Sequence, residues 1–102
     1  MKILFNRQNN VLYIKLNGEL DEHSAVSARR EADRLADSNA DCERVVFDLG
    51  EVSFMDSTGI GFLIGRYKKF NRYGVKAYIT NPSQTTDKIL AMSGIYSLIQ
   101  KL

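Results

Sequence analysis

Residues 54–65 decide the fold, because an apolar pair there runs into a helix-start signal and then a helix-like pattern: Phe54-Met55-Asp56-Ser57-Thr58-Gly59-Ile60-Gly61-Phe62-Leu63-Ile64-Gly65. Asp56, Ser57 and Thr58 favour helix N-termini, since their side-chain oxygens can accept hydrogen bonds from the unpaired N–H groups of a first turn. That end of a helix also favours negative charge. A hydroxyl held there suits the addition and removal of a phosphate, although an ordinary helix cap explains the same residues.

Three glycines interrupt this helical pattern: Gly59, Gly61 and Gly65. Each costs about 1 kcal/mol relative to alanine in a helix interior. Close packing of the helix on a sheet would explain them, and so would a bare surface on which a partner can lie. Both explanations can hold on different faces, and we expect at least one glycine to face outward.

The composition is that of one globular domain. The 102 residues are 44% apolar and 25% charged, enough for a modest two-layer core. No apolar run approaches the length of a membrane span, and the N-terminus is too soon polar for a signal peptide. Cys42 is alone, so neither a disulfide framework nor a metal cluster is expected. We expect a single domain over residues 1–102, located in the cytoplasm.

Positive charge gathers in the second half of the chain. Residues 57–102 hold seven basic residues and one acidic residue, although the net charge of the whole chain is only +2. Cations near the C-terminal end of a helix complement its dipole, and four of them follow Gly65: Arg66, Lys68, Lys69 and Arg72. We therefore favour a solvated helix end over a nucleic-acid patch, which would carry interleaved aromatic residues on the same face.

Strand and helix patterns alternate along the chain. Strands are predicted at 2–6, 11–16, 44–49 and 75–80, helices at 24–38 and 57–73, a third helix from an Asn81-Pro82 cap to Gly94, and a short strand within 95–102. The predicted inward stripe of the second helix is Ile60, Leu63, Ile64, Tyr67 and Phe70. This β-β-α-β-α-β-α order with a short terminal strand predicts an α/β fold with helices on a mixed sheet. Sites in such sheets lie at the carboxyl ends of parallel strands, where Ser57 is expected.

Catalysis finds little support. A nucleophilic Ser57 would need a base, and the G-x-S-x-G elbow is absent. The only histidine, His23, is best explained as a surface or capping residue near the first helix. The P-loop pattern is missing, and Gly59-Ile60-Gly61 alone is a weak nucleotide signal. No catalytic residue, metal or cofactor is expected.

Four segments occur in the order and spacing of one known family: Gly18-Glu19-Leu20-Asp21, residues 53–61, Gly65-Arg66-Tyr67-Lys68 and Met92-Ser93-Gly94-Ile95. On these residues the chain resembles the STAS-domain anti-sigma factor antagonists, and most of all their sporulation branch, the anti-sigma F factor antagonists. The resemblance implies a STAS-type fold and a role in transcription regulation by partner switching. It covers essentially the whole chain.

The resemblance also implies partners and a site. The unphosphorylated antagonist of that family binds an anti-sigma factor that is also a serine kinase, which releases the sigma factor. The kinase phosphorylates the serine that matches Ser57, and a PP2C-type phosphatase reverses this. The partner surface implied is Asp21, Asp56, Ser57, Thr58, Gly59 and Gly61, with no direct nucleic-acid or membrane partner. A STAS regulator of another pathway, such as general stress response, is the alternative. In either case Ser57 should be exposed in a first helical turn, beside the loop of Asp21.

Overall fold

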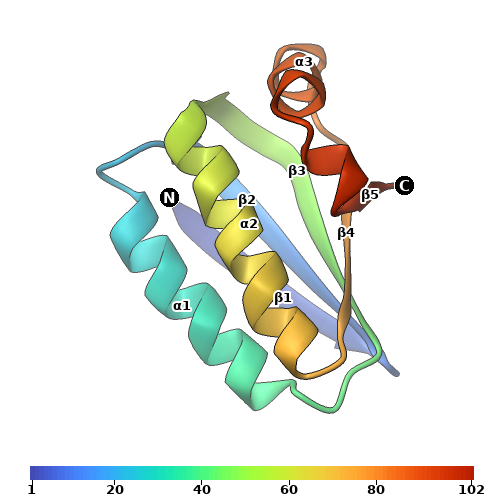
Figure 1. Ribbon diagram of the computed structural model, residues 1–102. Coiled ribbons are helices and arrows are strands. Elements are labelled where there is room, and N and C mark those ends of the chain that lie inside the picture. The colour runs from blue at the N-terminus through green and yellow to red at the C-terminus, as the bar shows by residue number, and fades with distance from the viewer.

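A computed structural model describes residues 1–102 and shows one five-stranded sheet with helices packed against it (Figure 1). The elements in chain order are β1 (Lys2–Gln8), β2 (Val11–Leu20), α1 (Ala25–Ser38), β3 (Arg44–Met55), α2 (Ser57–Arg72), β4 (Lys76–Thr80), α3 (Gln84–Ser93), a 3-10 turn (Ile95–Ser97) and β5 (Gln100–Lys101). The strands lie side by side in chain order. β1 is antiparallel to β2, and every other pair is parallel. The predicted fold class and element order are confirmed.

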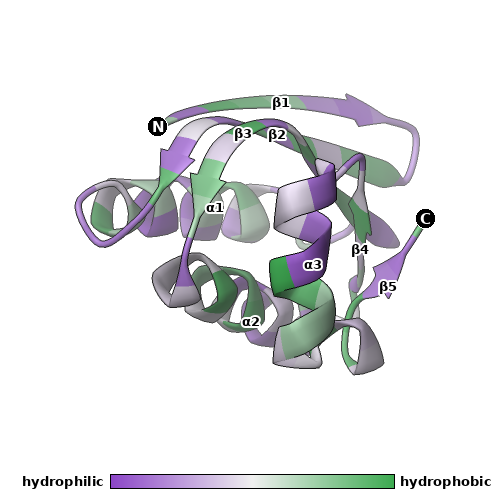
Figure 2. Cartoon of the chain, turned by 90° about the horizontal axis from the view of Figure 1, so that it is seen from above, coloured by the Kyte–Doolittle hydropathy of each residue, from purple (hydrophilic) through white to green (hydrophobic).

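The core lies between the sheet and the two long helices. Figure 2 shows the sheet arching over α1 and α2, with α3 standing to one side of them near β4. Alternate residues of β2 and β3 point into this layer and are fully buried: Leu12, Ile14, Leu16, Val45, Phe47 and Leu49. The intervening Val46 is buried too, so β3 is covered on both faces at residues 45–47. None of the helices is both long enough and apolar enough to span a membrane.

The two central strands run further than the sequence pattern predicts. They were expected to end near residues 16 and 49, but β2 and β3 stay paired as far as Leu20 opposite Met55. The pairing survives because the register shifts twice, and Gly18 takes a φ of +121° beside the second shift. Glycine alone adopts such an angle readily. The extension brings the loops that follow the two strands to the same end of the sheet.

The inward face of α2 differs from the predicted stripe. Leu63 and Phe70 are fully buried, as predicted, whereas three members are only partly buried: Ile60, Ile64 and Tyr67. Phe62 and Arg66 are buried instead. The physical reason is the second contact of α2, which packs against α1 as well as against the sheet. A single stripe drawn for one contact surface therefore misses part of the buried face.

The prediction of a solvated basic helix end is wrong for two of its four residues. The Arg66 side chain is only 8% exposed, and its Nε lies 2.8 Å from Oδ1 of Asp33 on α1. The Nζ of Lys69 lies 2.9 Å from Oδ1 of Asp37, also on α1. Lys69 and the hydroxyl of Tyr73 together hold the pKa of Asp37 below its ordinary value, with the Tyr73 hydrogen bond as the larger cause. Charges on facing helices thus pair across the α1–α2 contact.

The start of α3 is also corrected. Ser83, and not the Asn81-Pro82 pair, caps the helix, and its hydroxyl accepts a hydrogen bond of 3.1 Å from the backbone N–H of Thr86. Asn81 has a left-handed φ of 58°, so the chain turns there before the helix begins. Gly94 ends the helix with a φ of 79°, as predicted.

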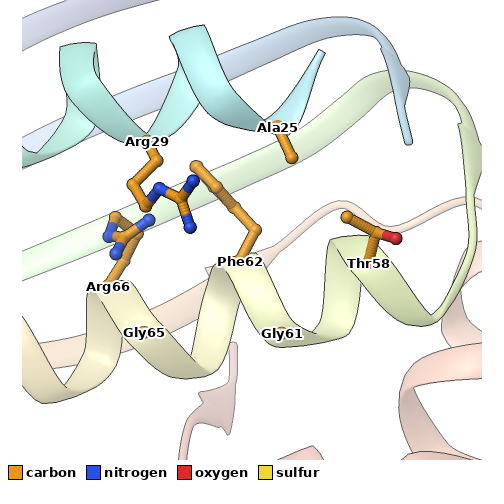
Figure 3. Close-up of a pocket in the computed structure, with 7 residues that line it drawn as sticks. All are labelled: Ala25, Arg29, Thr58, Gly61, Phe62, Gly65 and Arg66. Carbon is orange, nitrogen blue, oxygen red and sulfur yellow. The ribbon is translucent and has the colours of Figure 1, made fainter. Parts of the chain in front are cut away.

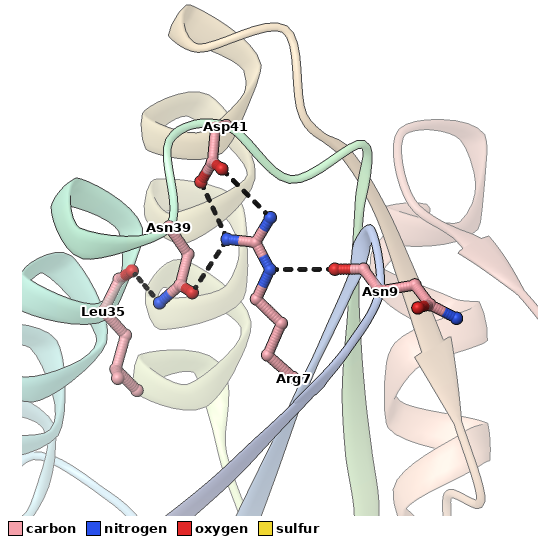
Figure 4. Close-up of polar contacts among 5 residues, drawn as sticks. All are labelled: Arg7, Asn9, Leu35, Asn39 and Asp41. Carbon is pink, nitrogen blue, oxygen red and sulfur yellow. Dashed lines mark hydrogen bonds and ion pairs between the residues drawn. The ribbon is translucent and has the colours of Figure 1, made fainter.

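A cluster around Arg7 ties the edge strand to the far end of α1 (Figure 4). Its guanidinium donates to both carboxylate oxygens of Asp41, at 2.7 and 3.2 Å, to Oδ1 of Asn39 and to the backbone oxygen of Asn9. Asn39 in turn donates to the carbonyl of Leu35 at 2.8 Å. A two-pronged arginine contact fixes geometry better than a single bond. It holds the β1–β2 hairpin against the loop before β3.

Candidate functional site

The candidate site forms where β2 and β3 end together. Because Leu20 lies opposite Met55 in a parallel pair, the residues that follow them, Asp21 and Asp56, start neighbouring loops. Ser57 is the first residue of α2, and it is exposed. The structure therefore confirms the expected geometry: an exposed serine in a first helical turn, beside the loop of Asp21.

Asp56 is the residue that caps α2. Its backbone is extended, and its Oδ1 accepts a hydrogen bond of 2.9 Å from the backbone N–H of Thr58. Its carbonyl also accepts from the N–H groups of Gly59 and Ile60. Of the three residues that could have capped the helix, Asp56 does so, and no hydrogen bond within the chain holds the Ser57 hydroxyl. That hydroxyl is left free for chemistry.

The loop beside Ser57 is organised by Asp21. Its Oδ1 accepts hydrogen bonds from the backbone N–H groups of Ser24, at 3.0 Å, and His23, at 2.9 Å. These bonds, the one from Ser24 first, lower the pKa of Asp21 below its ordinary value, so the carboxylate is charged at neutral pH. Asp21 thus presents a fixed negative charge next to the start of α2.

The three glycines of α2 have different surroundings. Gly59 is buried, and a side-chain carbon added there would lie 2.5 Å from Cγ of Met55 and 3.3 Å from Cδ2 of Leu20. Gly61 is exposed. The space beside both Gly61 and Gly65 is open, because a side-chain carbon added at either would meet no atom within 4 Å. The prediction of an outward-facing glycine is confirmed for these two. Internal packing explains Gly59, so we leave it out of the contact surface.

Sequence reasoning missed one feature of this surface. Phe54, one residue before the end of β3, is 49% exposed, although it was taken only as half of the apolar pair that leads into the helix. Its neighbour Met55 is buried. Strand alternation would have identified one of the pair as outward-facing. Phe54 lies three residues before Ser57 and lines a hollow with residues of α3. An exposed aromatic ring is a typical anchor for a protein partner.

The enzyme hypothesis gains nothing from the structure. The His23 side chain is 89% exposed, and its Nε2 lies 3.9 Å from a carboxylate oxygen of Glu22. Its backbone N–H helps to form the Asp21 loop. The position fits the surface role that the sequence favours. A catalytic serine would instead need an imidazole within hydrogen-bond reach of its hydroxyl.

Comparison with known proteins identifies the family of the chain. A model of the STAS domain matches residues 2–102, so the chain belongs to the STAS domain family, and within it to the anti-sigma factor antagonists.

The relatives named as such antagonists match over most of their lengths. The chain is 32% identical to the anti-sigma F factor antagonist of Paenibacillus polymyxa over 99 residues, which is 97% of this chain and 84% of the relative. It is 31% identical to the anti-sigma-B factor antagonist of Bacillus subtilis (strain 168), over 91% of this chain and 84% of the relative.

The fold is that of a solved antagonist. The unphosphorylated form of the anti-sigma factor antagonist SpoIIAA matches with a TM-score of 0.80 at 24% identity, covering 99% of this chain and 88% of that one. SpoIIAA has also been solved in a phosphorylated form.

Proposed function

We propose that this protein is an anti-sigma factor antagonist that works by partner switching. Its unphosphorylated form binds an anti-sigma factor that is also a serine kinase, and this binding releases the sigma factor. The kinase transfers phosphate to Ser57, and a PP2C-type phosphatase removes it. The observation that carries the proposal is the exposed Ser57 hydroxyl, which no hydrogen bond holds, in the first turn of α2 beside the Asp21 loop.

The proposed contact surface surrounds that hydroxyl. It consists of Asp21, Phe54, Asp56, Ser57, Thr58 and Gly61. Phe54 supplies an apolar anchor, and Gly61 leaves room for the partner to approach the helix backbone. The protein acts by binding, not by catalysis, and it does so in the cytoplasm. No nucleic acid or membrane contact is part of the proposal.

Phosphate on Ser57 would leave the fold intact and disrupt the complex. It adds about −1.5 to −2 charges at pH 7, at a helix N-terminus whose dipole favours negative charge. Asp56 is adjacent and its carboxylate already occupies the cap. A partner surface shaped for a hydroxyl would have to accommodate a bulky, strongly anionic group and strip its water. We expect binding to weaken by about 2–5 kcal/mol, which is roughly thirty-fold to several-thousand-fold.

Variants at Ser57 test the proposal directly. Titration calorimetry of the kinase in the presence of nucleotide should show tight binding of wild type and Ser57→Ala, and poor binding of Ser57→Asp. Ser38→Asp is the matched control, because Ser38 is an exposed serine at the opposite end of α1. Mass spectrometry should place the phosphate on Ser57 and find none on Ser57→Ala. Phosphate arriving on Thr58, or a phosphorylated form that binds like the bare one, would contradict the mechanism.

A second candidate is the same mechanism in another pathway, such as general stress response. The similar identity to an anti-sigma-B factor antagonist favours it. Binding measured against one kinase of each type would separate the two, since the cognate kinase should bind far more tightly than the other. The geometry around Ser57 serves both candidates equally well.

A further inference from the structure

A positively charged pocket lies between α1 and α2, next to the proposed contact surface. Its volume is about 360 Å³, and it is lined by Ala25, Arg29, Thr58, Gly61, Phe62, Gly65 and Arg66. Figure 3 shows the Arg29 side chain reaching from α1 toward α2, so that its guanidinium faces that of Arg66. Nothing in the proposed phosphate switch uses either arginine.

Arg66 is buried and incompletely partnered. Its side chain is 8% exposed, and its guanidinium carbon sits 5.2 Å from the centre of the Phe62 ring. Its Nε is 2.8 Å from Oδ1 of Asp33, but the two atoms are not aligned for a hydrogen bond, and its Nη1 is buried with no acceptor. A buried donor without an acceptor is costly. Arg66, which lines the pocket, is therefore short of an oxygen ligand for its buried donors.

Arg29 adds a second cation and no compensating anion. It forms no ion pair, whereas Arg66 has only Asp33 beside it. Burial first, and the field of Arg29 in addition, lower the pKa of Arg66 from its usual value. The Arg66 guanidinium nevertheless remains protonated, as arginine does in proteins. Two cations facing one carboxylate leave an excess of positive charge, which a bound anion would neutralise.

The floor of the pocket is open because two residues of α2 lack side chains there. A side-chain carbon added at Gly61 or Gly65 would meet no atom within 4 Å. The space can therefore admit a side chain from outside. Thr58 and Gly61 belong to the pocket and to the proposed contact surface alike, so a partner lying over Ser57 also lies over the pocket.

We propose that the Arg29–Arg66 pocket receives a carboxylate side chain of the anti-sigma factor, an aspartate or glutamate that binds both guanidinium groups. This inference rests on the proposed function. Charge complementarity and the continuity of the two surfaces identify the occupant. Planar guanidinium groups match carboxylates in two-pronged geometry. With negative Asp21 on one side and the cationic pocket on the other, the surface has two poles, which orient the partner.

The test compares two arginines one residue apart on α1. In Arg29→Gln the pocket loses a cation, whereas Arg30→Gln removes the same charge from an exposed position outside the pocket. Surface plasmon resonance against the kinase should show about tenfold weaker binding for Arg29→Gln, which corresponds to about 1.4 kcal/mol, and little change for Arg30→Gln. Arg29→Glu should bind more weakly still. Thermal melts should show all three variants folded.

Three outcomes would overturn the proposal, and they are distinguishable. Equal binding by Arg29→Gln and Arg30→Gln, with wild type binding tightly, would refute the pocket and leave the proposed function standing. No binding by wild type would refute both. Titration with inorganic phosphate gives the third outcome. If phosphate shifts the Arg66 side-chain NMR signals to a saturating value, while Arg29→Gln binds the kinase normally, the pocket is a free-anion site instead.

Discussion

Alanine substitution at each glycine of α2 should produce opposite effects on stability within a single helix. At Gly61 and Gly65 the added carbon meets nothing within 4 Å, so only helix propensity changes, and each substitution should stabilise the protein by about 1 kcal/mol. At Gly59 the same carbon would lie 2.5 Å from Cγ of Met55. Met55 is 3% exposed and cannot move aside into solvent.

The magnitude follows from two competing terms. Overpacking a filled site costs about 1–3 kcal/mol, against the gain of about 1 kcal/mol in propensity, so Gly59→Ala should be neutral to clearly destabilising. In a domain of this size 1 kcal/mol moves the melting temperature by about 4–8 °C. Calorimetric melts should therefore place Gly59→Ala at or below wild type, and Gly61→Ala and Gly65→Ala above it.

Binding to the kinase adds an independent measurement. Gly61→Ala should bind less tightly than wild type despite its greater stability, because the new methyl group stands on the contact surface. A Gly59→Ala protein that melts as high as Gly61→Ala would refute the packing argument. Undiminished binding by Gly61→Ala would remove that residue from the interface and leave its openness without a role.

Two further predictions concern charge. Asp21→Asn keeps an oxygen for the loop hydrogen bonds but loses the charge, so it should slow association with the kinase and reduce its salt dependence; unaltered binding at low salt would contradict this. Tyr96 is the main cause of the low pKa of Asp87, with Lys101 next, whereas burial and Asp87 raise the pKa of Tyr96. These groups therefore stabilise the fold above the unfolded pKa of Asp, near 4, and below that of Tyr, near 10. In urea melts Tyr96→Phe should lower the free energy of unfolding most between these two pH limits, and less outside them. A loss of unfolding free energy that stays the same at every pH would contradict the assignment.

The candidate site could be located from the sequence because its signals are local. Helix-start chemistry at Asp56-Ser57-Thr58 depends on a few neighbouring residues, and the structure has an exposed Ser57 in the first turn of α2. The alternation of strands and helices implied parallel pairing, which brings Asp21 beside that turn. The position of Gly94 at the end of α3 was equally local, since its left-handed backbone favours glycine.

Burial of charged and apolar residues depended on contacts between distant segments. By its spacing Arg66 belongs to a basic helix end, yet α1 covers it and supplies Asp33. The strand extension to Leu20 and Met55 required two register shifts that no residue pattern announces. Local chemistry by itself determined where α2 begins and which serine stands in its first turn. Only tertiary packing decided which charges meet across α1 and α2, because the environment of a side chain is set by whatever element faces it.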